Sequence, residues 1–99
     1  MKLVWSRRAQ NDLIGVGEFI SRHAPDSARK HVQLLVERAK QAAQFPQAGR
    51  IVPEYGQEAL REIIEGNYRI VYEVNTTQKT VTVLTVFEAH RLILIRKGE

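Results

Sequence analysis

The sequence predicts an α+β fold, in which an N-terminal strand precedes an antiparallel helical hairpin that packs on one face of a small antiparallel β-sheet. Apolar residues recur at spacings of three and four over residues 7–44, as in amphipathic helices. Residues 60–88 instead carry β-prone runs separated by turn residues. The order is therefore β-α-α-β-β-β, and 99 residues form a single domain over 1–99.

The first half of the chain divides at residues with known local preferences. Residues 2–6 (KLVWS) form a predicted short strand whose serine caps the next element. A first helix is expected over 7–23, and a second over 25–44, which begins at a proline suited to the first helical turn. Residues 45–49 (FPQAG) contain two helix breakers, so the hairpin ends there.

The second half is expected to form an antiparallel meander, because its connections are short. Residues 50–54 (RIVPE) are predicted to be a short strand that ends, or lies at an edge, at its proline. Strands over 60–65 and 68–74 flank Gly66-Asn67, a two-residue hairpin signal, and a further strand follows over 80–88. The tail over 89–99 is left open between an edge strand, a short helix and an apolar strip for a partner.

Composition restricts the classes of function. Fifteen Lys and Arg oppose eleven Asp and Glu, which gives a formal net charge of +4 and favours an acidic partner, either nucleic acid or an acidic protein. The chain has no cysteine, so disulfides and cysteine-based metal sites are excluded. No leader peptide or membrane-length apolar stretch is recognised, and no membrane association, cofactor or metal is predicted. We therefore expect a cytoplasmic protein.

The arginines supply the candidate binding site. Alternation places Tyr68, Ile70 and Tyr72 on the face toward the helices and Arg69 on the opposite, more exposed face. If the register brings Arg61 to the face of Arg69, two guanidinium groups converge there. Such groups suit phosphate or carboxylate, because their planar fork bonds bidentately. The set predicted to form a target-binding basic face is Arg50, Arg61, Arg69 and Arg91.

An ordinary structural role is the alternative for the same side chains. Arg69 then pairs with Glu73 or Glu62, and Arg61 with Glu88. Exposed pairs of this kind contribute little to stability.

Three segments in order resemble the RelE/ParE superfamily of toxins from type II toxin–antitoxin systems: PQAGRIVPE, LREIIEGNYRIVYEV and VTVLTVFEAHRLI. The two predicted helices are similar to the paired helices of that superfamily. The resemblance covers residues 3 to about 93, and it is closer to the ParE-like branch.

The resemblance implies one of two activities. RelE-like members cleave messenger RNA on the ribosome without metal. By this analogy Arg69 would stabilise charge, Glu54 lies near the position of a catalytic glutamate, and His90 is the candidate acid. No tyrosine follows Tyr72, and residues 45–60 contain no lysine, which departs from the RelE-like pattern. We therefore favour the second activity, ParE-like poisoning of DNA gyrase by binding.

The resemblance also implies a partner. A cognate antitoxin would neutralise the toxin through a disordered segment that folds on contact, in a heterotetramer or larger assembly. That segment is expected to lay a helix along the toxin's helical hairpin and to add a strand to a sheet edge.

Overall fold

The computed structural model describes residues 1–89, so the predicted tail over 89–99, with His90 and Arg91, lies almost wholly outside the described residues. The elements follow the predicted order: β1 (Lys2–Trp5), α1 (Arg7–His23), α2 (Pro25–Gln44), the short 3-10 helix η1 (Pro46–Ala48), β2 (Arg50–Ile51), β3 (Leu60–Glu65), β4 (Tyr68–Asn75) and β5 (Thr80–Glu88). The predicted α+β fold is confirmed.

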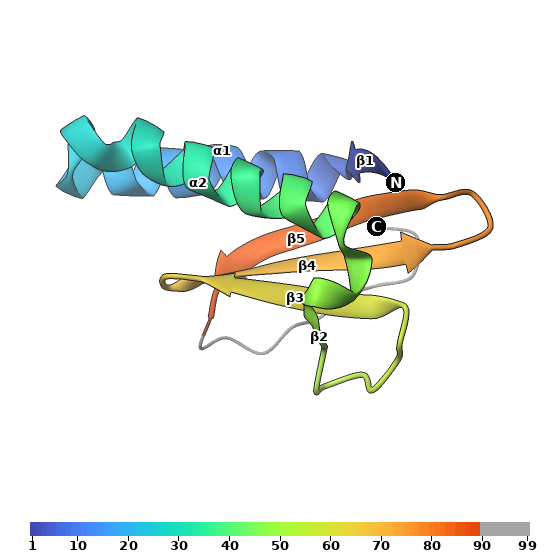
Figure 1. Ribbon diagram of the computed structural model, residues 1–99. Helices are drawn as coiled ribbons and strands as arrows, with labels where there is room; N and C mark the ends of the chain where they lie inside the picture. The colour runs from blue at the N-terminus through green and yellow to red at the C-terminus, as the bar shows by residue number, and fades with distance from the viewer. Residues whose placement is uncertain (90–99) are drawn as a thin grey trace.

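The helical hairpin lies along one face of the sheet (Figure 1). The hydroxyl of Ser6 accepts a hydrogen bond from Ala9 N at 3.0 Å, which satisfies one of the free N–H groups at the start of α1. Pro25 opens α2, and Asp26 lies in its first turn, where a negative charge is favourable. Ala24 alone separates the two helices, which lie side by side and run antiparallel (Figure 1).

The sheet has the strand order β1-β5-β4-β3-β2. Strands β2 to β5 form the predicted antiparallel meander. The sheet as a whole is mixed, because β1 pairs parallel to β5. The two helices separate β1 from every other strand, so no short turn fixes its direction, and it joins the edge opposite β2.

β2 is shorter than the predicted strand over 50–54. Its pairing ends at Ile51, and the chain turns at once: Val52 O accepts hydrogen bonds from Tyr55 N at 3.1 Å and Gly56 N at 2.9 Å. Pro53 has no N–H to donate to a ladder, and Gly56 adopts a φ of +63°, which favours glycine. The turn therefore places Glu54 at its tip.

The core lies on both faces of the sheet. Ile70 and Tyr72 are buried beneath the helices, as predicted, against alanines of α2 such as Ala39 and Ala42. The opposite face was predicted to be the more exposed one, but it carries a buried cluster of its own. Val52, from the turn, packs there against Val71, which is 0% exposed. The other members of this second cluster are Tyr55, Leu60, Leu84 and Phe87.

A register irregularity in the β4–β5 ladder is satisfied by side chains near the start of α1. Val71 is opposite Thr85 but Tyr72 is opposite Val83, so Leu84 is an extra residue on β5. Ser6 Oγ donates to Leu84 O at 3.0 Å, and an Asp12 carboxylate oxygen accepts from Thr85 Oγ1 at 2.6 Å and Val86 N at 3.1 Å. These bonds fix α1 over β5.

Candidate functional site

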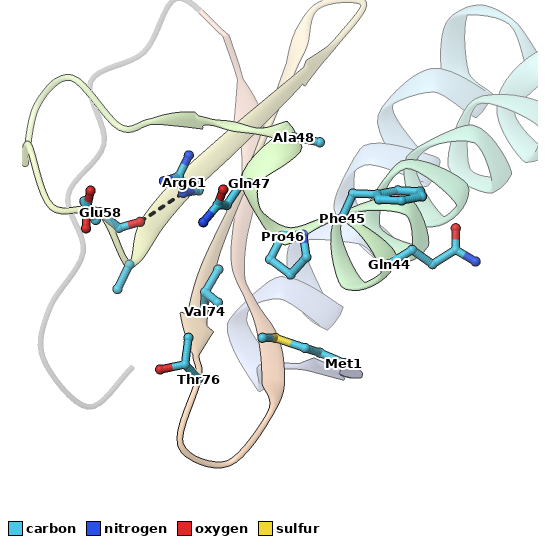
Figure 2. Close-up of a pocket in the computed structure, with 11 residues that line it drawn as sticks. Met1, Gln44, Phe45, Pro46, Gln47, Ala48, Glu58, Arg61, Val74 and Thr76 are labelled. Atoms are coloured by element: carbon cyan, nitrogen blue, oxygen red, sulfur yellow. Dashed lines mark hydrogen bonds between the residues drawn. The ribbon is translucent and has the colours of Figure 1, made fainter.

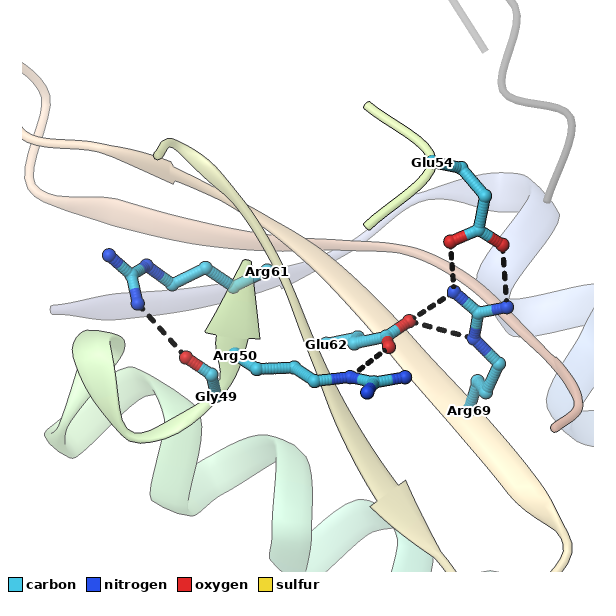
Figure 3. Close-up of polar contacts among 6 residues, drawn as sticks. All are labelled: Gly49, Arg50, Glu54, Arg61, Glu62 and Arg69. Atoms are coloured by element: carbon cyan, nitrogen blue, oxygen red, sulfur yellow. Dashed lines mark hydrogen bonds and ion pairs between the residues drawn. The ribbon is translucent and has the colours of Figure 1, made fainter. Parts of the chain in front are cut away.

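Arg69 is the centre of a buried ionic network. It lies on β4, and its side chain is 6% exposed. Its Nη1 and Nη2 donate to the two carboxylate oxygens of Glu54 at 2.8 and 2.9 Å, a bidentate pair. Its Nε donates to Glu62 Oε1 at 2.7 Å, and Nη2 also contacts that oxygen (Figure 3). Such charge-assisted bidentate pairs are among the strongest protein hydrogen bonds.

Glu62 links this pair to a second arginine. Its side chain is 0% exposed on β3, and Arg50 Nε donates to its Oε2 at 2.6 Å. The network therefore contains two guanidinium groups and two carboxylates, in the order Arg50, Glu62, Arg69, Glu54 (Figure 3). Arg69 and Glu62 are buried, whereas Arg50 is 58% exposed, so the charges at the buried centre are balanced by partners that reach solvent.

The surroundings keep Arg69 charged. The hydrogen bond to Glu54 raises the pKa of Arg69 above its ordinary value, burial acts in the opposite sense, and Glu62 adds to the rise. The guanidinium carbon also lies 5.1 Å from the centre of the Phe87 ring, within the range of a cation–π contact.

Arg61 does not join Arg69, and the predicted convergence of the two is wrong. In the β3–β4 ladder Arg61 is opposite Tyr72, whereas Arg69 is opposite Ile64, so the two arginines lie on different faces of the sheet. Arg61 donates to backbone carbonyls instead, from Nη1 to Gly49 O and from Nε to Glu58 O, both at 3.0 Å.

The family described as "ParE toxin of type II toxin-antitoxin system, parDE" matches residues 3–93.

The chain belongs to the ParE toxin family.

Solved structures share the fold of this ParE-family chain. A chain of the chromosomal ParDE system from P. aeruginosa superposes with a TM-score of 0.73 at 24% identity, over 89% of this chain and 95% of that one. The isolated E. coli RelE toxin gives 0.65 at 20% identity, over 92% and 86% of the two chains. The intact E. coli RelBE complex also gives 0.65 at 20%, over 91% and 98%. Comparison with curated proteins gave no match.

Some predicted site residues of the ParE-family chain meet and others do not. The structure brings Arg50, Arg69 and Glu54 into one network. The alternative pairing of Arg69 with Glu62 is confirmed. Arg61 lies on the other face.

Glu62 was foreseen only as a possible pairing partner, although it is the central carboxylate of the network. The sequence feature that indicates this role is a glutamate in the middle of the β-prone run LREIIE. The strand predicted to pair with that run has an arginine near its own centre.

On the helix-facing side of the sheet, Tyr72 anchors the segment that leads into β2 and Arg50. Its hydroxyl donates to Pro46 O at 2.8 Å and accepts from Gly49 N at 3.0 Å, which ties the segment before β2 to the sheet. Burial raises the pKa of Tyr72, so the phenol stays neutral and can donate.

A separate pocket of about 670 Å³ lies beyond the end of α2 (Figure 2). Phe45, Pro46, Met1 and Val74 supply apolar walls, and Arg61 lines one side. Arg69 and Glu54 are not among its lining residues, so pocket and ionic network are distinct features. Among the described residues, no helix is long and apolar enough to cross a membrane, and no group of three His, Asp or Glu side chains is placed to hold a metal ion.

Proposed function

We propose that this toxin acts as ParE-like toxins do, by binding DNA gyrase and poisoning it. The observation that carries the proposal is the match to the ParE family over residues 3–93. Binding preferentially to one state of an enzyme is enough to trap that state, so no catalytic group is required of the toxin. The basic character of the chain suits a target that holds DNA.

The ionic network also supports a binding role. A metal-independent ribonuclease must take a proton from a 2′-hydroxyl and neutralise charge on phosphate with separate groups. Glu54 and Arg69, the residues that the RelE resemblance assigns to those tasks, are bonded to each other at 2.8 and 2.9 Å. In this arrangement each group already satisfies the charge of the other.

The test is controlled expression in bacteria with two readouts. Gyrase poisoning predicts the DNA damage response and filamentous cells while protein synthesis continues. Rapid arrest of translation, with messages cut on ribosomes, would instead establish the ribonuclease.

The ribonuclease is the second candidate, because the isolated E. coli RelE toxin shares the fold with a TM-score of 0.65. Substitution Glu54→Gln together with His90→Gln separates the two activities. If the doubly substituted protein is still toxic, the result supports gyrase poisoning. If it folds normally but is no longer toxic, the result supports the ribonuclease.

We also infer that a cognate antitoxin binds the toxin in the cytoplasm and folds on contact, in a heterotetramer or larger assembly. Apolar side chains on the helical hairpin support this inference: Ile14 is 60% exposed, Phe19 49% and Leu34 45%. A partner helix with an apolar face would cover such a surface.

A further inference from the structure

The pocket at the end of α2 is walled by apolar side chains that the fold leaves in contact with solvent (Figure 2). Phe45, at 66%, is the most exposed large apolar side chain in the described part of the chain, and Met1 is 46% exposed. Pro46 and Val74 complete the apolar wall. The volume of about 670 Å³ lies within the range of ligand sites in proteins, about 300–1,000 Å³. Exposed aromatic and Met side chains around a hollow are typical of a surface that a partner covers.

The wall that connects α2 to β2 is held in place by hydrogen bonds along its length. Phe45 N donates to Gln41 O at 2.8 Å, and Ala48 N donates to Phe45 O at 2.9 Å. The Tyr72 hydroxyl donates to Pro46 O at 2.8 Å. The pocket is therefore formed before a ligand arrives, and binding requires little further ordering of this wall.

Arg61 brings a positive charge to the other side of the pocket. Its Nε donates to Glu58 O and its Nη1 to Gly49 O, both at 3.0 Å, and both acceptors are backbone carbonyls. The guanidinium is thus oriented by neutral groups, and it points away from the ionic network around Arg69 (Figure 3). Within residues 1–89, no carboxylate forms an ion pair with Arg61. Its charge is therefore held in a fixed place without a counter-ion from the described chain.

These two sides favour a ligand that has an apolar part and an anionic part. Arg61 is only partly exposed, so its charge is screened less than that of a fully exposed arginine. The lining residues that the structure describes include one acidic side chain, Glu58, and it is exposed, so solvent screens its repulsion. Nucleic acid is less suited to the pocket, because its phosphates are usually bound by several cations and only one Lys or Arg side chain lines these walls.

We propose that this pocket docks a segment of a partner protein in which a bulky apolar side chain is followed closely by an Asp or Glu. The apolar side chain packs against Phe45 and Pro46, and the carboxylate bonds Nη2 of Arg61. The net charge of +4 attracts acidic segments in general. The described lining residues of this pocket are separate from those at Phe19 and Leu34, where we place the antitoxin, so both surfaces can be occupied together. The proposal concerns binding alone and holds whether the toxin acts on gyrase or on the ribosome.

The test is an NMR titration of the isotope-labelled full chain with the capped peptide acetyl-Phe-Glu-Glu-amide. We expect shifts at the backbone amides of Phe45 and Val74 and at the Nε–Hε group of Arg61. Two control peptides separate the two parts of the ligand: acetyl-Phe-Gln-Gln-amide lacks the carboxylates, and acetyl-Gly-Glu-Glu-amide lacks the ring. Each control should bind at least about fivefold more weakly. Equal binding of either control, shifts confined to residues outside the pocket, or no binding at millimolar peptide would overturn the proposal.

Substitutions in the chain show whether the peptide contacts these walls. Phe45→Ser should weaken binding of acetyl-Phe-Glu-Glu-amide about tenfold, whereas Phe19→Ser, a half-exposed phenylalanine outside the pocket, should change it less than about twofold. Arg61→Gln should weaken binding about fivefold, and Arg29→Gln, which removes an equal charge from an exposed position on α2, less than about twofold. Equal losses in a variant and its control would contradict the proposal.

Arg61→Gln also removes the bonds to Gly49 and Glu58, so a further variant separates binding from structure. Glu58→Gln keeps the backbone carbonyl that orients Arg61 and removes the negative charge at the pocket. It should tighten binding of the acidic peptide about twofold at low salt, and unchanged or weaker binding would count against the proposal. Tighter binding of a hexathymidylate oligonucleotide than of acetyl-Phe-Glu-Glu-amide would assign the pocket to nucleic acid and reject a protein segment.

Discussion

Glu62 is a carboxylate without exposed surface that lies between two guanidinium groups, and its neighbours depend on it. If it is neutralised, the guanidinium of Arg69 loses the charged partner that lies deepest in the sheet. Breaking a buried ion pair by removing one partner is costly, because the other charge stays desolvated. The network therefore contributes to the stability of the central strands.

We therefore predict that Glu62→Gln lowers the free energy of unfolding by about 3 kcal/mol. Glu73→Gln, on the neighbouring strand but exposed, is the control and should change it by less than about 0.5 kcal/mol. Urea unfolding followed by circular dichroism measures both. Similar values for the two variants would show that the network adds nothing to stability.

Tyr72 gives a second prediction at the residue scale, in alkaline solution. Burial raises the pKa of this phenol above the ordinary value of 10.0, with Gly49 and Arg61 acting in the opposite sense. The folded state therefore holds its proton more tightly than the unfolded chain. This contribution to stability is complete below about pH 10 and is lost as the pH rises through the folded-state pKa.

The variant Tyr72→Phe should accordingly lose about 1–2 kcal/mol at pH 7, from its bonds to Pro46 and Gly49, and show a shallower decline above pH 10. The pKa of Tyr68 is also raised, by burial and by Glu88, so part of the decline will remain. Urea unfolding at pH 8 and pH 11 measures the difference. Parallel declines in parent and variant would argue against a buried neutral phenol at this position.

At the scale of elements, the two-residue turn of the β3–β4 hairpin determines which face of the sheet each arginine occupies. The two-residue turn at Gly66-Asn67 was predicted, and Glu65 pairs with Tyr68 across it. That register pairs each odd-numbered residue of β3 with an even-numbered residue of β4. Arg61 and Arg69 are both odd-numbered, so a two-residue turn had to place them on opposite faces.

Other features of the site were not accessible from local patterns. The helices, the hairpin and the helix-facing residues follow from periodicity and turn chemistry, which act over a few positions. The packing of Val52 and Tyr55 on the second face depends on a turn whose path is set by tertiary contacts. The pairing of Glu54 with Arg69 depends on that turn, and the parallel pairing of β1 joins the two ends of the described chain.

Gly49 makes the connection between the helices and β2 testable. A Cβ at this position would lie 2.3 Å from the Tyr72 hydroxyl and 2.7 Å from Glu62 O, so backbone or ring must shift. We predict that Gly49→Ala destabilises the protein by about 2 kcal/mol. Gly15→Ala, in α1 with nothing within 4 Å of the added carbon, should instead stabilise it by up to about 1 kcal/mol. Thermal unfolding of the two variants measures both effects. A Gly49→Ala variant more stable than the parent would contradict the close approach of Tyr72 and Glu62 to Gly49.

At the scale of the whole molecule, the sheet is covered unequally. The helices shield one face, and the turn after β2 and the ionic network cover part of the second face. Phe19 and Leu34 of the hairpin are about half exposed, and they line a hollow of about 290 Å³ together with Tyr68 and the turn between β3 and β4. A domain of this size is marginally stable, so a partner that covers such a surface would add to its stability.

This distribution predicts that the antitoxin and the target bind different surfaces of the toxin. We predict that Phe19→Asp with Leu34→Asp abolishes rescue by the antitoxin encoded beside the toxin, while toxicity without antitoxin is retained. Both side chains are about half exposed, so the fold should tolerate the change, and new negative charge opposes an acidic partner.

The matched control is Ile64→Asp, which is 44% exposed on the face of Arg69. Growth on co-expression, and co-purification of the antitoxin with each variant, measure the effect. Full rescue of the double variant, or loss of rescue in the control alone, would contradict binding of the antitoxin to the helical hairpin. Loss of rescue in the control alone would indicate that the antitoxin binds the face of the ionic network.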